Sequence, residues 1–171
     1  MSVGAEFLRY SVAKLRQESE HLDACVQKLT PEQVWTRGGE GQNAVGNLLL
    51  HLTGNIRQWI LSGVAGVAIR RDRDAEFAAR GGVAPDVLRS DLLEVIGDAI
   101  EVIEQLPESR LTEQMTIQGH DVSVLEAIYH VVEHFSGHTG QVILLTKAFT
   151  GTDMGFYGYL KSPGGAAGRK P

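Results

Sequence analysis

The chain has 171 residues, of which 43% are hydrophobic and 22% charged, and this composition is typical of one globular domain. Its formal net charge of −5 argues against a nucleic-acid-binding surface, and its single cysteine, Cys25, excludes an intrachain disulfide framework. Because the sequence shows no membrane-spanning run and no signal-peptide pattern, we expect a cytoplasmic protein.

The first long helix is predicted over residues 5–29. Its apolar residues recur in steps of three and four, which places them on one side of an amphipathic helix. Thr30 precedes Pro31 and Gln33, a pattern that predicts a capped start of a further short helix. The glycine-rich residues 37–41 then predict a loop.

A second long helix is predicted over residues 43–62, with Asn43 as its N-cap. A line of polar residues runs beside its apolar stripe, namely His51, Asn55, Gln58 and Ser62. Asn55 and Gln58 could contact a bound molecule or the surroundings of a metal, or they could lie at a dimer contact. Apolar residues on other faces of this helix favour a homodimer: Leu48, Leu50, Trp59 and Leu61.

Residues 63–84 are predicted to be a crossover with little structure. Its basic residues are interleaved with acidic ones, so that the charges largely cancel: Arg70, Arg71 and Arg73 with Asp72 and Asp74. Residues 85–106 predict the third long helix. Residues 108–122 are expected to form a loop with short extended pieces on either side of Gln118-Gly119.

The fourth long helix is predicted over residues 123–149. Ser123 and Glu126 match a capping box, and Gly151 lies where a C-terminal glycine is expected. The pattern favours an all-α bundle comprising residues 1–160, with a mobile tail over residues 161–171. Side chains near the end of this domain are expected to dock on the bundle: Phe156, Tyr157, Tyr159 and Leu160.

Three histidines of the fourth helix lie four residues apart, so they share one face of that helix. His134 and His138 border its apolar stripe, whereas His130 is expected further round, towards solvent near Glu126 and Glu133. Two histidines at positions i and i+4 on an inward face can chelate one divalent metal ion. They could equally be ordinary histidines, each bonded to a backbone carbonyl or to water.

His51 of the second helix is the candidate for a third ligand, because it borders the apolar stripe there. Three neutral imidazoles would leave coordination positions open, as catalytic metal sites do. A ferritin-like di-iron site is excluded, since it needs inward carboxylates that Glu126 and Glu133 do not supply. Cys25 has neither a nearby cation nor a helix N-terminus to activate it as a nucleophile.

Residues 43–59 and the H-x3-H-x2-Q segment from His134 to Gln141 resemble the second-helix and fourth-helix signatures of the DinB-like superfamily. The resemblance implies a four-helix bundle with up-down-down-up connections, a long crossover between the second and third helices, and a homodimer. It also implies a metal held by His51, His134 and His138. Many relatives have an arginine where this chain has Thr139, so a substrate contact made by that arginine is not expected here.

Characterised members of that superfamily are metal-dependent thiol transferases and isomerases that use mycothiol, bacillithiol or glutathione. The resemblance therefore favours an enzyme in which a divalent ion, zinc or nickel, activates such a thiol. Gln141 is the candidate catalytic residue and Asn55 the candidate cofactor-binding residue. The alternative is a non-catalytic, dimeric metal-binding or stress-response protein that retains the three histidines.

Overall fold

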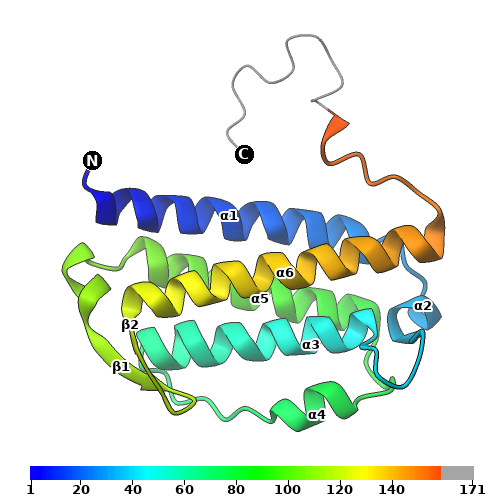
Figure 1. Ribbon diagram of the computed structural model, residues 1–171. Helices are drawn as coiled ribbons and strands as arrows, with labels where there is room; N and C mark the ends of the chain where they lie inside the picture. The colour runs from blue at the N-terminus through cyan, green and yellow to red at the C-terminus, as the bar shows by residue number, and fades with distance from the viewer. Residues whose placement is uncertain (159–171) are drawn as a thin grey trace.

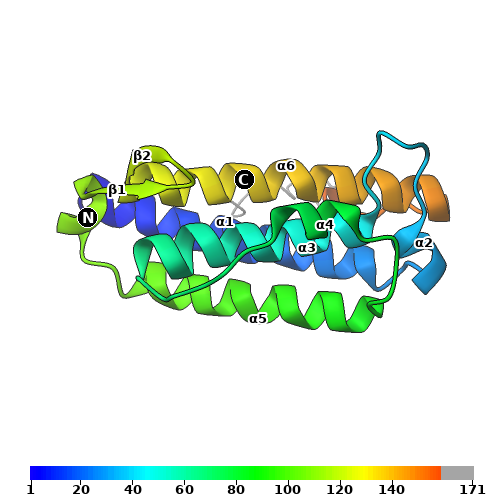
Figure 2. The same cartoon turned by 90° about the horizontal axis from the view of Figure 1, so that it is seen from below.

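The computed structural model describes residues 1–158, and it is built mainly from long helices. Figures 1 and 2 show the long helical segments side by side, with α1 and α6 running in one direction and α3 and α5 in the other. These segments are α1 (Val3–Val26), α3 (Val45–Ile56) with its continuation η1 (Arg57–Val64), α5 (Pro85–Glu104) and α6 (Val124–Thr150). The predicted helical class is confirmed.

Shorter elements connect the long helices. They are the helices α2 (Pro31–Trp35) and α4 (Arg73–Ala78), the 3-10 helix η2 (Glu108–Thr112), and the strands β1 (Gln114–Ile117) and β2 (His120–Ser123). The two strands pair antiparallel around Gln118 and Gly119, both of which have positive φ. The extended pieces expected there are therefore confirmed, and they add a small hairpin to the helical fold.

The core lies between the inward faces of the long helices. Large apolar side chains from all of them are almost fully buried, among them Leu15, Leu52, Leu92 and Phe135. Cys25 is also buried there, and burial raises the pKa of its thiol. Lys147 and Lys28 act in the opposite direction, so the expectation of no nearby cation was wrong, but burial outweighs them and the raised pKa agrees with an inactive thiol. No helix among residues 1–158 has the length and apolar character needed to cross a membrane.

Several predicted helix ends are confirmed. Thr30 and Ser123 both form capping boxes, and Gly151 ends α6 in the left-handed conformation at φ 64°. The prediction that Asn43 caps the second helix was wrong, because Ala44 occupies that position. The Ala44 N–H donates instead to Oδ1 of Asn47 at 3.1 Å, so the cap comes from inside the helix.

The crossover is more ordered than expected, because it contains α4. Asp72 caps this helix by accepting the Ala75 N–H at 3.0 Å. Asn47 then holds α4 against α3 by donating to the backbone oxygens of Glu76 (2.9 Å) and Ala79 (3.0 Å). Figure 2 shows α4 lying over α3. Part of this charged segment therefore forms a helix that packs against α3.

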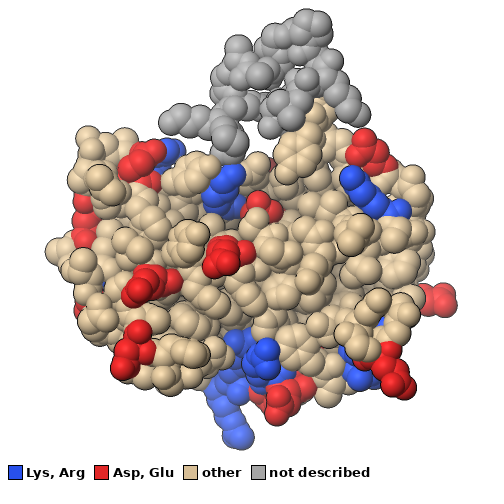
Figure 3. All heavy atoms as spheres, in the orientation of Figure 1, with Lys and Arg blue, Asp and Glu red and all other residues tan. Residues whose placement is uncertain are grey.

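The apolar residues that favoured a dimer have partners within one chain. Leu48 and Trp59 are 2% and 5% exposed, and Leu50 and Leu61 pack against the same core. Their number alone therefore does not require a second copy of the chain. On the face shown in Figure 3, basic side chains lie in small groups beside acidic ones and form no continuous basic patch.

The end of the described chain only partly matches the prediction. Phe156 stacks on His21 with ring centroids 4.1 Å apart, so this side chain docks on α1 as expected. Tyr157 does not dock, since it is 61% exposed. Tyr159, Leu160 and the predicted tail at 161–171 lie outside the described residues.

Candidate metal site

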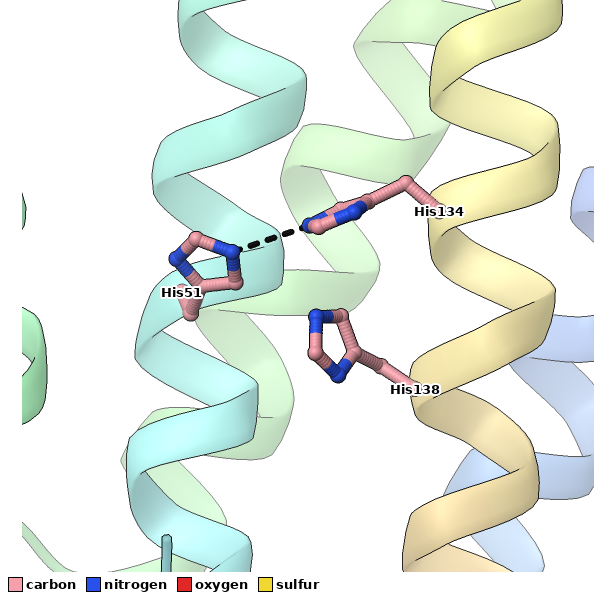
Figure 4. Close-up of side chains that lie close together, drawn as sticks. All are labelled: His51, His134 and His138. Atoms are coloured by element: carbon pink, nitrogen blue, oxygen red, sulfur yellow. Dashed lines mark hydrogen bonds between the residues drawn. The ribbon is translucent and has the colours of Figure 1, made fainter.

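Three imidazoles meet in the space between α3 and α6. His51 comes from α3, and His134 and His138 come from successive turns of α6 (Figure 4). Nε2 of His134 lies 2.9 Å from Nε2 of His51, and one nitrogen of each ring lies within 4.8 Å of the others. The structure thus brings together the three residues that the sequence suggested as metal ligands.

The spacing of these nitrogens suits one divalent ion. Metal–imidazole bonds of about 2.0–2.1 Å in a tetrahedral site place two ligand nitrogens roughly 3.3 Å apart. Small side-chain movements would bring the observed positions to that value. All three donors are imidazole nitrogens, which suit zinc and nickel better than magnesium or calcium. His134 and His138 are only half-buried, so the site also has access to solvent.

Glu76 of α4 contacts the far side of the His51 ring. Its Oε2 lies 2.9 Å from Nδ1 of His51, and both side chains are almost fully buried. A carboxylate can only accept, so Nδ1 carries the proton and donates it to Glu76. The other ring nitrogen, Nε2, therefore presents its lone pair towards His134 and His138.

Arg71 forms a bidentate ion pair with the carboxylate of Glu76. Its Nε donates to Oε1 of Glu76 at 2.7 Å and its Nη2 donates to Oε2 at 2.8 Å. Its Nη1 donates to Oε1 of Gln58 at 2.8 Å, and Gln118 of the hairpin donates to the same oxygen at 2.5 Å. Burial raises the pKa of Glu76, but the hydrogen bonds from Arg71 and His51 outweigh it and leave this pKa below its ordinary value.

Gln141 has a similar relation to His138. Its Oε1 accepts a hydrogen bond from Nδ1 of His138 at 2.8 Å, which leaves Nε2 of that ring facing the other histidines. Gln141 itself is exposed. Its predicted catalytic role stays a prediction, and its contact shows how it would orient a ligand. Thr139 is fully buried and lies away from the solvent-accessible side.

His130 lies beside the triad but is not part of it. We expected it on the solvent side, yet it is half-buried, with its ring 4.0 Å from that of Trp59. Its Nε2 is 3.3 Å from Nδ2 of Asn55. Trp59 belongs to η1, a π-helical stretch that periodicity did not predict, and such stretches are frequent at functional sites.

Asn55, the predicted cofactor-binding residue, lies one turn beyond His51 and is 4% exposed. Its Oδ1 has no hydrogen-bond partner within the described part of the chain. An unpaired buried acceptor is costly, so a donor from a bound molecule or water would be stabilised there. The role of Asn55 in binding a cofactor remains a prediction.

The lowered pKa values of the half-buried histidines predict that acid destabilises the metal-free protein. Burial, reinforced by the neighbouring His138 and His51, lowers the pKa of His134 from 6.5 to about 3. Between these pH values the unfolded chain binds a proton that the folded chain does not, so the free energy of unfolding falls as the pH falls. Glu76 acts in the same direction, because its stabilising contribution is present above its ordinary pKa of 4.5 and is lost in acid.

Urea unfolding of chelator-treated protein at several pH values would measure this loss. His134→Gln should reduce the slope of stability against pH between 6.5 and about 3. It should not abolish the slope, since burial also lowers the pKa of His130 and of His138. A parent protein that grows more stable as the pH falls through this range would contradict the prediction.

Comparisons with known proteins agree with this fold. A DinB-like protein from Bacillus cereus ATCC 10987 is 17% identical with a TM-score of 0.67, and the match covers 84% of this chain and 93% of that one. A conserved protein from Enterococcus faecalis is 13% identical with a TM-score of 0.73, and the match covers 89% and 99%. The protein therefore has the DinB-like helical fold, as the resemblance implied.

A third solved structure is a mutant of mycothiol-dependent maleylpyruvate isomerase. It is 14% identical with a TM-score of 0.64, and the match covers 83% of this chain but only 63% of that enzyme. At this identity the likeness concerns the fold alone. The comparison with curated proteins finds no match. The chain belongs to the DUF1572 family, described as proteins of unknown function, whose family model matches residues 2–158.

Proposed function

We propose that this protein is a metal-dependent enzyme that uses a low-molecular-weight thiol. The observation that carries the proposal is the convergence of His51, His134 and His138, with Nε2 of His51 directed at the other two rings. These three imidazoles, with no fourth His, Cys, Asp or Glu grouped with them among residues 1–158, match the open pattern of catalytic sites. A structural relative of this chain is by name mycothiol-dependent, which supports the thiol as the second component.

The three histidines would hold zinc or nickel on an up-down-down-up four-helix bundle, which we expect to be a homodimer. A divalent ion lowers the pKa of a thiol that it binds, and so supplies a thiolate nucleophile near neutral pH. Gln141 would keep His138 in the orientation that its 2.8 Å hydrogen bond defines. Asn55 would accept a hydrogen bond from the thiol cofactor through its unpaired Oδ1. The thiol could be mycothiol, bacillithiol or glutathione.

A non-catalytic metal-binding role is the second candidate, and Thr139 favours it. This residue follows the last histidine of the triad, where many relatives have an arginine, and its side chain is fully buried. It therefore offers no cation to an electrophilic substrate. A protein that binds and stores metal, or responds to stress through it, would not need one.

Thiol titrations distinguish the two candidates. Protein loaded with Co²⁺ is titrated with mycothiol, bacillithiol or glutathione, and the visible absorption of the metal is recorded. The enzyme proposal predicts a saturable spectral change with one of these thiols, and metal-dependent consumption of that thiol with a chromophoric aryl chloride. In that assay the thiol sulfur replaces chloride on the ring, and the thiol proton goes to the buffer. Metal binding without any thiol response would favour the non-catalytic role.

A further inference from the structure

We propose that Glu76 and Arg71 are the positioning pair of the candidate metal site. Glu76 holds the Nδ1–H of His51 so that Nε2 faces His134 and His138, and Arg71 holds Glu76 in place. The proposal rests on the proposed function, since it takes these three histidines as the metal ligands. It assigns to the crossover between η1 and α5 a part in building the site.

The hydrogen-bond geometry leaves one consistent arrangement of protons. Nδ1 of His51 lies 2.9 Å from Oε2 of Glu76 and 3.1 Å from Nη2 of Arg71. If Arg71 donated to Nδ1, that nitrogen would carry no proton and its lone pair would face the carboxylate oxygen. Arg71 instead donates its Nε proton to Oε1 and one Nη2 proton to Oε2 of Glu76. Its second Nη2 proton has the backbone oxygen of His51 as an acceptor at 3.4 Å. The proton on Nδ1 therefore belongs to the bond with Glu76.

The surface of α3 leaves room for this pair. A Cβ added to Gly54 would lie 2.0 Å from Oε1 of Glu76 and 2.8 Å from Nε of Arg71. Gly54 is three residues beyond His51, on the adjoining turn of the helix. Only a residue without a side chain lets the ion pair lie against the helix at this point. The close approach of the pair to the helix thus depends on this glycine.

The backbone of α4 is also held in place around His51. Asn47 donates to the backbone oxygen of Glu76, and Arg37 donates in turn to Oδ1 of Asn47 at 2.6 Å. Phe77, the next residue along α4, packs its ring 4.6 Å from that of His51. Adjacent residues of one short helix therefore contact the same imidazole, one through its Nδ1 and one through its face.

A purely structural role explains the pair less well. The Arg71 and Glu76 side chains are 7% and 10% exposed, and burying two opposite charges costs desolvation energy that apolar residues of similar size avoid. Apolar side chains would therefore hold α4 on α3 at least as well. What an apolar pair lacks is an acceptor for the Nδ1–H of His51. Partners of this kind fix the tautomer and orientation of metal-bound histidines.

The test compares Glu76→Gln with Asp23→Asn in the full-length protein. Asp23 pairs with Arg89 in a half-buried ion pair between α1 and α5, so its variant makes the same chemical change away from the histidines. Co²⁺ affinity is measured by titration of metal-free protein, and the tautomer of His51 by ¹⁵N NMR. We expect Glu76→Gln to weaken Co²⁺ binding about 10–100-fold and to change the visible spectrum of the bound ion. It should also reduce the share of the Nδ1–H tautomer, whereas Asp23→Asn should change none of these.

The outcomes separate this proposal from the metal site itself. Equal Co²⁺ affinity, spectrum and tautomer in Glu76→Gln and the parent would overturn the positioning role and leave the three-histidine site standing. A parent that binds no Co²⁺ would overturn the proposed function, and the tautomer of His51 in metal-free protein would still decide what Glu76 does. If Glu76→Gln does not fold, Arg71→Lys is the alternative variant. It keeps the carboxylate of Glu76 and a positive charge at position 71 but loses the bidentate contact. We expect Arg71→Lys to weaken Co²⁺ binding in the same direction, and an unchanged affinity would overturn the role of Arg71.

Discussion

Replacing any one of His51, His134 and His138 by alanine is expected to remove most of the bound metal. Two imidazoles hold a divalent ion far less tightly than three, so the loss of affinity should exceed the roughly 10–100-fold cost of removing a partner that only orients a ligand. Metal content after one purification protocol and Zn²⁺ titration of metal-free protein would measure the effect. The protein should remain helical, because the apolar core is built without the histidines.

His130→Ala is the matched control for these variants. His130 lies one turn before His134 on the same helix and is also half-buried, but it is outside the group of converging nitrogens. Its removal should leave the metal content nearly unchanged. Added metal should raise the melting temperature of the parent and of His130→Ala, and should have little effect on the triad variants. If His130→Ala emptied the site while His51→Ala kept it full, the assignment of the third ligand would be wrong.

The long helices could be predicted from the sequence because their apolar residues follow the helical period over many turns. The three histidines could be identified as candidate ligands for the same reason. His134 and His138 share a helix face, and His51 borders the apolar stripe of another helix, so packing the two stripes together brings the rings close. In both cases a local pattern of side chains determines which face is buried. Where such a local pattern exists, the structure places the residues as the sequence predicted.

The Arg71–Glu76 pair could not be predicted in this way, because its local sequence resembles a solvated charged segment. Its burial depends on distant residues: Gly54 leaves the space against α3, and Asn47 binds the backbone of α4. Asp72 as an N-cap and the acidic residues of the first turn were local signals of a helix there, and they say nothing about a contact with His51. The half-buried position of His130 was missed for a related reason, since the π-helical turn that brings Trp59 against it has no signature in the apolar period.

Phe135→Ala is expected to lower the unfolding free energy and leave the metal content unchanged, whereas the loss of a triad histidine should mainly remove metal. Phe135 is the next residue after His134, yet its side chain points into the core and is 1% exposed. Replacing a buried phenylalanine by alanine removes apolar contacts and leaves a cavity, which costs about 3–5 kcal/mol of unfolding free energy. Urea unfolding of metal-free protein would measure this loss. While the variant remains folded, its metal stoichiometry should equal that of the parent, because no ligand has been removed.

Leu144→Ala on the same helix provides the control for this prediction. Leu144 is 68% exposed, so its truncation should change the unfolding free energy by no more than about 0.5 kcal/mol. Together with His134→Ala, these variants would show whether α6 has separate faces for stability and for metal. His134→Ala should lose metal and retain most of the stability of the metal-free protein, whereas Phe135→Ala should lose stability and retain metal. Loss of metal from fully folded Phe135→Ala would mean that core packing sets the positions of the histidines, and that the two faces of α6 do not act independently.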